Sequence, residues 1–154
     1  MKKIKNIYLI GIGGAGMSGI AEILLNSGYK VSGSDNASSL ITSRLQNLGI
    51  NVFDNHDSEN LKNIDLIVYS SAISEDNPEM IHGKKMGIPI IRRAEMLANL
   101  MNLKKSIAIA GSHGKTTTTC ILAHIFTKCN LDPTYIIGGK IKTFESNAAL
   151  GKGP

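Results

Sequence analysis

The chain has 154 residues, with 42% hydrophobic residues, 19% charged residues and a formal net charge of +5. This composition is typical of a globular protein and excludes collagen-like, mucin-like and disordered chains. Its two cysteines, Cys120 and Cys129, lie in no metal-binding pattern, which excludes a disulfide scaffold and favours a reducing compartment.

Short apolar runs alternate with helical patterns over the first hundred residues. Strands are predicted at 4–10, 30–34, 51–53, 66–69 and 89–91, and helices at 17–25, 38–48, 78–86 and 94–101. Pro78 near the start of one helix and Gly87 after its end follow the usual asymmetry of helix termini. The alternation predicts an α/β fold with a parallel, doubly wound sheet over residues 1–103.

A second unit is predicted to begin after the polar pair Lys104-Lys105. It contains a predicted strand at 106–110, a helix at 115–129 and a strand at 135–137, whereas 138–154 shows no clear element. These elements are too few for a complete α/β domain, so 104–154 is interpreted as the beginning of one. Its excess of lysine over acidic residues is typical of phosphate or nucleic-acid binding, or of a domain whose acidic residues lie elsewhere.

A first glycine loop, GIGGAG at 11–16, lies between a predicted strand and a predicted helix. Glycines in this position allow a diphosphate to approach the backbone and the N–H groups at the start of the helix. Asp35 follows Gly16 by nineteen residues, at the end of the second strand, where dinucleotide-binding folds place an acid against a ribose. By itself this pattern is also consistent with an NAD(P)-binding oxidoreductase.

A second loop, GSHGKTT at 111–117, also connects a predicted strand to a helix. In phosphate loops the lysine contacts the β- and γ-phosphates and the hydroxyl that follows it binds Mg²⁺. This loop is two residues shorter than the standard pattern. Two phosphate loops do not fit a simple dehydrogenase, and they favour an ATP-using enzyme with a nucleotide-linked substrate.

Six motifs together resemble the Mur ligase family: GIGGAGM at 11–17, GSD at 33–35, SSAI at 70–73, NPE at 77–79, RRAEML at 92–97 and GSHGKTTTT at 111–119. The short phosphate loop is the form that this family has. The resemblance implies a Rossmann-like domain at 1–103 that binds a UDP-sugar rather than NAD, followed at 104–154 by the incomplete beginning of a P-loop ATPase domain.

The resemblance also implies two sets of site residues. The UDP-sugar set is Gly11, Ile12, Gly13, Gly14, Ala15, Gly16, Met17, Ser34, Asp35, His56, Ser70, Ser71 and Ala72. The ATP set is Gly111, Ser112, His113, Gly114, Lys115, Thr116 and Thr117, with Lys115 and Thr116 catalytic and Thr116 a ligand of Mg²⁺.

The implied activity is ATP-dependent amide formation in peptidoglycan synthesis. The γ-phosphoryl group would pass to the lactyl carboxylate of UDP-N-acetylmuramate, and the amine of L-alanine would attack the acyl phosphate. The RRAEML and SSAI motifs favour this branch over the sister branch that attaches a preformed peptide. An NAD(P)-binding oxidoreductase and a non-catalytic nucleotide-binding module each fit the first glycine loop as well.

The remaining expectations concern location and completeness. No apolar run approaches the ~18 residues of a membrane span, so we expect a cytoplasmic protein without membrane insertion. No aromatic residues are interleaved with basic ones, so no nucleic-acid partner is expected. The family's acidic Mg²⁺ ligands and its third domain are not in this sequence, so we expect the chain alone to be inactive.

Overall fold

The computed structural model describes residues 4–138 and 147–153. Its centre is a five-stranded sheet with the strand order β3-β2-β1-β4-β5, and every neighbouring pair is parallel. The elements in chain order are β1 (Asn6–Ile10), α1 (Ala15–Asn26), β2 (Lys30–Ser34), α2 (Leu40–Asn47), β3 (Asn51–Phe53), a 3₁₀ turn (Ser58–Asn60), β4 (Leu66–Tyr69), α3 (Pro78–Lys85), β5 (Ile90–Arg92), α4 (Arg93–Met101), α5 (Lys115–Lys128), β6 (Tyr135–Ile136) and β7 (Ala148–Ala149). The predicted α/β fold with a parallel sheet is confirmed.

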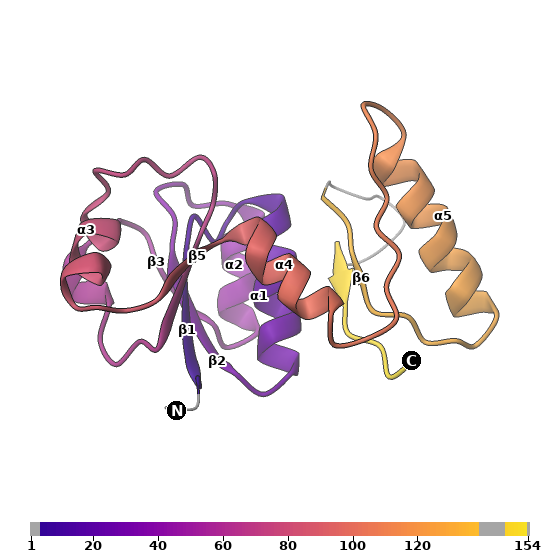
Figure 1. The fold of residues 1–154 in the computed structure, drawn as a ribbon, viewed down its shortest axis with the longest axis horizontal. Coiled ribbons are helices and arrows are strands. Elements are labelled where there is room, and N and C mark those ends of the chain that lie inside the picture. Colours follow the sequence, from indigo (N-terminus) through magenta and orange to yellow (C-terminus); the bar gives the residue numbers. More distant parts are fainter. Residues whose placement is uncertain (1–3, 139–146, 154) are drawn as a thin grey trace.

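The sheet is covered on both faces because the side chains of its strands alternate in direction. Ile7 and Leu9 of β1 pack with α1, α2 and α4, whereas Tyr8 and Ile10 pack with α3 and the 3₁₀ turn. Figure 1 shows α1, α2 and α4 on one side of the sheet and α3 on the other. The switch point of the sheet lies at β1, because β2 and β3 lie on one side of it and β4 and β5 on the other. In sheets of this kind ligands bind at the switch point, outside the carboxyl ends of the strands.

Two helices begin with capping residues that the sequence supplies. Ser39 and Thr42 form a reciprocal capping box at the start of α2. Asn77 caps α3, and its Oδ1 accepts from the N–H groups of Glu79 and Met80 at 2.9 and 3.2 Å. Pro78 is the first residue of α3, a position that proline favours, and Glu79 follows it in the first turn of the helix.

The region after residue 103 differs from its prediction in two respects. Residues 106–110 do not form the predicted strand, because no described strand lies beside them to complete a ladder, and Ile107 is 64% exposed. Residues 148–149, where no element was expected, form β7 and pair antiparallel with β6. Residues 139–146, in the interval between the two strands, lie outside the described residues.

The β6–β7 hairpin lies against α1 of the first unit. Ile137 and Ala148 are buried, and Asn147 donates to the carbonyl oxygen of Ala15. The Nζ atom of Lys104 also donates to the carbonyl oxygens of Gly151 and Gly153, both at 2.8 Å. The end of the chain is therefore packed on the parallel-sheet domain, whereas α5 stands apart from it (Figure 1).

Two further expectations concern the cysteines and the membrane. Cys120 and Cys129 are both free thiols. The longest helix in the described part of the chain, α5, has 14 residues, and no helix there combines the length and apolar character needed to cross a bilayer.

Candidate functional site

The first glycine loop connects β1 to α1 at the switch point of the sheet. Four of its N–H groups are used within the protein: Gly11 and Ile12 donate to the carbonyl oxygen of Ser34 at 2.8 and 3.0 Å, Gly13 to Asp35, and Gly14 to the carbonyl oxygen of Gly11. The next two N–H groups, of Ala15 and Gly16, have no partner among the described residues. The first turn of α1 therefore presents two open donors to an anion.

Asp35 holds this loop in place. Its Oδ2 accepts from the Gly13 N–H at 2.9 Å and its Oδ1 from the Ala37 N–H at 3.0 Å. A Cβ atom at position 13 would lie 2.8 Å from Asp35 Oδ2 and 3.0 Å from a methyl group of Thr42. The glycine at position 13 thus allows the carboxylate to approach the loop backbone, while a contact of Asp35 with a ribose stays a prediction.

Two neighbours complete the surroundings of the loop. Ser70, at the end of β4, lies so close that a Cβ on Gly11 would be 3.2 Å from its Cβ. The guanidinium of Arg93, at the start of α4, lies over Gly16, with Nη1 2.7 Å from the place of a Cβ there. Arg93 is half-buried and has no acidic partner among the described residues. A cation therefore lies beside the two open N–H groups.

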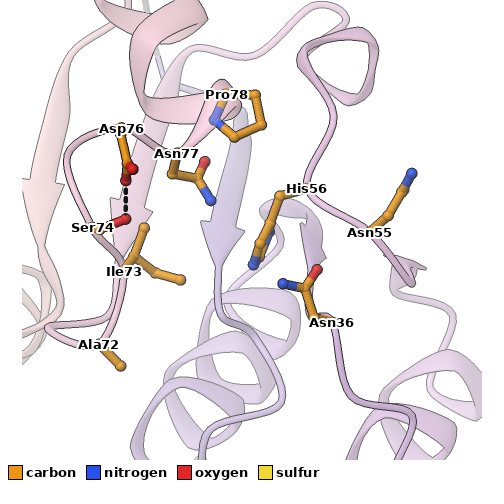
Figure 2. Close-up of a pocket in the computed structure, with 9 residues that line it drawn as sticks. All are labelled: Asn36, Asn55, His56, Ala72, Ile73, Ser74, Asp76, Asn77 and Pro78. Atoms are coloured by element: carbon orange, nitrogen blue, oxygen red, sulfur yellow. Dashed lines mark hydrogen bonds between the residues drawn. The ribbon is translucent and has the colours of Figure 1, made fainter.

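A cavity of about 520 Å³ opens next to this loop, at the carboxyl ends of β2, β3 and β4. Figure 2 shows the His56 ring extending toward Asn36, with the segment 72–78 opposite it. The lining residues are Asn36, Asn55, His56, Ala72, Ile73, Ser74, Asp76, Asn77 and Pro78. They are mainly polar and small, and they can hydrogen-bond a polar ligand.

Beneath the cavity lies Glu79, a carboxylate with no exposed surface. Its Oε2 accepts from the Ser34 hydroxyl at 2.6 Å and lies 3.2 Å from His56 Nδ1. Its Oε1 accepts from the Tyr8 hydroxyl at 2.6 Å, from Asn60 Nδ2 at 3.0 Å and from the Asp57 N–H at 3.3 Å. Four donors and the His56 ring nitrogen surround the two oxygens, and such donors stabilise a buried carboxylate.

The Tyr8 hydroxyl keeps its proton and donates it to Glu79. Burial, followed by the hydrogen bond to Glu79, raises the pKa of its phenol. The proton therefore stays on Tyr8 throughout the physiological range. Ser34, also fully buried, lies between Glu79 and His56, and its Oγ is 2.8 Å from His56 Nδ1.

The second loop, at 111–117, is exposed along its length. Gly114 has φ +78°, a conformation that favours glycine, and it caps the start of α5. The N–H groups of Lys115, Thr116 and Thr117 have no partner among the described residues. The Lys115 ammonium folds back on the loop and donates to the carbonyl oxygens of Gly111 and Ser112.

These features fit the phosphates of a nucleotide, because open N–H groups at a helix start and a nearby lysine both favour anions. They provide less for a divalent cation. Thr116 offers one hydroxyl, and no group of three or more His, Cys, Asp or Glu side chains with metal-binding geometry occurs in the ranges 4–138 and 147–153. The loop before α5 projects on the same side of the molecule as the carboxyl ends of the sheet strands (Figure 1).

The structure groups the predicted UDP-sugar residues in three places. The loop 11–17 lies with Asp35 and Ser70 at the end of β1, His56 and Ala72 line the cavity, and Ser34 is buried between these places. Ser71 is exposed beside Ser70. Sequence reasoning did not assign a role to Glu79 or Arg93, although both lie in motifs that it singled out, NPE and RRAEML.

Comparisons with known proteins agree with this architecture. The description "Mur ligase family, catalytic domain" matches residues 6–105. A curated UDP-N-acetylmuramate–L-alanine ligase from Sulfurihydrogenibium shares 56% sequence identity with this chain over 98% of its residues. Another, from Psychrobacter, shares 53% identity over 99% of the chain. The chain spans about a third of the length of these relatives, 33% and 32%.

Solved structures show the same relationship. A UDP-N-acetylmuramate–alanine ligase from Thermotoga maritima superposes with a TM-score of 0.92, with 34% identity over 99% of this chain and 36% of its own. A Neisseria meningitides ligase of UDP-N-acetylmuramate and L-alanyl-γ-D-glutamyl-meso-diaminopimelate gives 0.87, with 31% identity over 95% of this chain and 46% of its own. With 100 consecutive residues matched by the family description and more than half of all residues shared with curated members, the chain belongs to the Mur ligase family.

Proposed function

We propose that this chain is the UDP-N-acetylmuramate-binding region, with the ATP phosphate loop, of a ligase that adds L-alanine to that sugar nucleotide. The observation that carries the proposal is the pairing of an open anion site with a polar cavity at one edge of the sheet. The cited curated relatives that share 53–56% of residues with the chain are L-alanine ligases, which supports the alanine branch. The solved alanine and preformed-peptide ligases, at 34% and 31% identity, do not separate the two branches.

In this proposal the diphosphate binds at the start of α1. The Ala15 and Gly16 N–H groups would donate to its oxygens, and the Arg93 guanidinium beside them would balance its charge. The four preceding N–H groups of the loop would fix its shape instead of binding the ligand. The uridine would occupy the cavity beside His56 and Ala72.

The second loop would act on ATP. The γ-phosphoryl group of ATP would pass to the lactyl carboxylate, with ADP as the leaving group. The amine of L-alanine would then attack the carbonyl carbon of the acyl phosphate, which forms the amide and releases phosphate and a proton. Lys115, released from the Gly111 and Ser112 carbonyls, would neutralise the charge that builds up when two anions meet. Mg²⁺, held in part by Thr116, would supply further charge neutralisation when bound.

The experiment that tests this proposal is a thermal shift assay. UDP-N-acetylmuramate or UDP at about 100 times its dissociation constant should add about 2.7 kcal/mol to the free energy of unfolding. NADH is the comparison ligand, because a nicotinamide-dependent oxidoreductase would use the same type of glycine loop. A shift with NADH and none with either uridine nucleotide would contradict the proposal.

A further inference from the structure

The hydrogen bonds around Glu79 define which nitrogen of His56 carries the proton. Ser34 has one hydroxyl proton, and it is donated to Glu79 Oε2 at 2.6 Å. The Ser34 oxygen, 2.8 Å from His56 Nδ1, must therefore accept from that nitrogen. The carboxylate is the second acceptor for the same N–H, at 3.2 Å.

We propose that Glu79 is a positioning residue that keeps neutral His56 in its Nδ1–H form, so that Nε2 accepts a hydrogen bond from a donor group of the uridine nucleotide. The inference rests on the proposed function for its ligand. The His56 side chain is 12% exposed and lines the cavity, and its Nε2 has no partner among the described residues. A bare Nε2 selects ligand N–H or O–H groups and disfavours carbonyl oxygens.

In UDP, two kinds of donor fit this description: the imide N–H of the uracil ring and the ribose hydroxyls. A cytosine ring lacks the imide proton and presents a bare nitrogen at that position. If the imide N–H is the partner, the Nδ1–H form of His56 therefore distinguishes uracil from cytosine. If a ribose hydroxyl is the partner, Nε2 of the same form accepts from that hydroxyl and holds the ribose in position.

The variant Glu79→Gln should reverse the direction of the hydrogen bonds that connect residue 79, Ser34 and His56. The Asp57 backbone N–H and the Asn60 Nδ2 group, which donate to Oε1, are nitrogens that can only donate. The carbonyl oxygen of the glutamine side chain should therefore face them. Its NH₂ group then faces Ser34 and His56. The Ser34 oxygen would accept from this amide and donate to His56 Nδ1, which moves the histidine proton to Nε2.

Nitrogen-15 NMR of the imidazole ring tests this directly in the 154-residue chain at pH 8. We expect a proton on Nδ1 and a bare Nε2 in the wild-type chain, and the opposite form in Glu79→Gln. Tyr8→Phe removes a donor from the Oε1 side of the same carboxylate, so it should lower stability and leave the Nδ1–H form of His56 unchanged. A proton on Nε2 in the wild-type chain would overturn the inference without any variant.

Binding measurements connect this form of the ring to the ligand. Glu79→Gln should weaken UDP binding by about threefold to tenfold, the effect of losing one hydrogen bond. One of the analogues 3-methyl-UDP, 2′-deoxy-UDP and 3′-deoxy-UDP should bind the wild-type chain more weakly than UDP by a similar factor, and Glu79→Gln should bind that analogue and UDP equally. Glu22→Gln, at a buried acid paired with Arg44 away from the cavity, is the matched control.

The outcomes separate the two proposals. If the wild-type chain binds UDP and all three analogues equally, or if Glu79→Gln changes neither the ring nor the affinity, the inference about Glu79 is wrong and the proposed function survives. If the wild-type chain binds neither UDP nor UDP-N-acetylmuramate, the proposed function itself fails, and the inferred ligand contact of Nε2 fails with it.

Discussion

Gly19 of α1 faces Ala148 of β7 so closely that a Cβ atom at position 19 would lie 3.1 Å from the Cβ of Ala148. The same atom would lie 3.3 Å from a methyl group of Ile136 in β6. A glycine in the middle of a helix costs up to about 1 kcal/mol relative to alanine. At this position it allows the hairpin near the end of the chain to rest on the first domain.

We therefore predict that Gly19→Leu separates the β6–β7 hairpin from α1. The added side chain has no space between the two, and overpacking of this kind costs about 1–3 kcal/mol. Hydrogen exchange should become fast at 135–137 and 148–149 while β1 and β4 stay protected. Ala98→Leu, on an exposed position of α4, is the control and should leave the exchange unchanged. Equal protection in both variants would show that the packing adapts.

The second prediction concerns Gly13→Val in the first loop. A Cβ at position 13 would clash with Asp35 Oδ2 and with Thr42, so the hydrogen bond that holds the loop should break. We expect a loss of stability of about 1–3 kcal/mol and no thermal shift with UDP. Gly138→Val is the matched control, because a Cβ at position 138 meets no heavy atom of the described residues within 4 Å. A full UDP shift in Gly13→Val would mean that this loop does not bind the diphosphate.

Much of the architecture could be predicted from the sequence, and the reasons are local. A short apolar run such as 66–69 is typical of a buried strand, and β2, β3 and β4 have the predicted bounds. The failure at 106–110 has a different origin. A strand depends on a neighbour for its hydrogen bonds, and the apolar pattern at 106–110 carries no information about whether that neighbour is present.

The candidate site was predictable only in part. The glycine loops have a recognisable spacing. That spacing does not show that four N–H groups of the first loop are used inside the protein, because three of them donate to the Ser34 carbonyl oxygen and to Asp35, at the end of β2. In the sequence, Glu79 is marked only by its place in the NPE motif at 77–79, directly after a helix cap. Its importance comes from the hydrogen-bonding groups at positions 8, 34, 56, 57 and 60 that the fold brings together.

The third prediction is a pH effect of Tyr8. Because its pKa is raised in the folded chain, the unfolded chain releases the phenol proton first, near pH 10. The contribution of Tyr8 to stability is therefore complete below pH 10 and declines above it, by up to about 1.4 kcal/mol for each pH unit. Tyr8→Phe should cost about 1–3 kcal/mol at pH 7.

Denaturant unfolding at several pH values measures this effect. The difference in stability between the wild-type chain and Tyr8→Phe should narrow above pH 10, and ultraviolet absorbance should show one tyrosine that does not ionise until the chain unfolds. A difference that stays constant from pH 7 to pH 11 would show that Tyr8 ionises normally in the folded chain.

The last prediction concerns activity. We expect this chain to release no phosphate that depends on L-alanine when it is given ATP, Mg²⁺ and UDP-N-acetylmuramate. Phosphoryl transfer depends almost wholly on positioning and charge neutralisation. For this, the described residues offer Lys115, the N–H groups at the start of α5 and one hydroxyl, that of Thr116, but no cluster of carboxylates for the metal. Each ~1.4 kcal/mol of missing stabilisation reduces the rate tenfold, so the loss should be many decades.

Weak ATP binding is nevertheless expected, because the open N–H groups and Lys115 do not depend on the metal. Lys115→Ala should remove this binding, whereas Lys128→Ala, at the far end of α5, is the matched control and should retain it. Titration with a fluorescent ATP analogue measures both variants. Alanine-dependent phosphate release by the wild-type chain that disappears in Lys115→Ala would contradict the prediction, because it would mean that the residues of this chain are sufficient for catalysis.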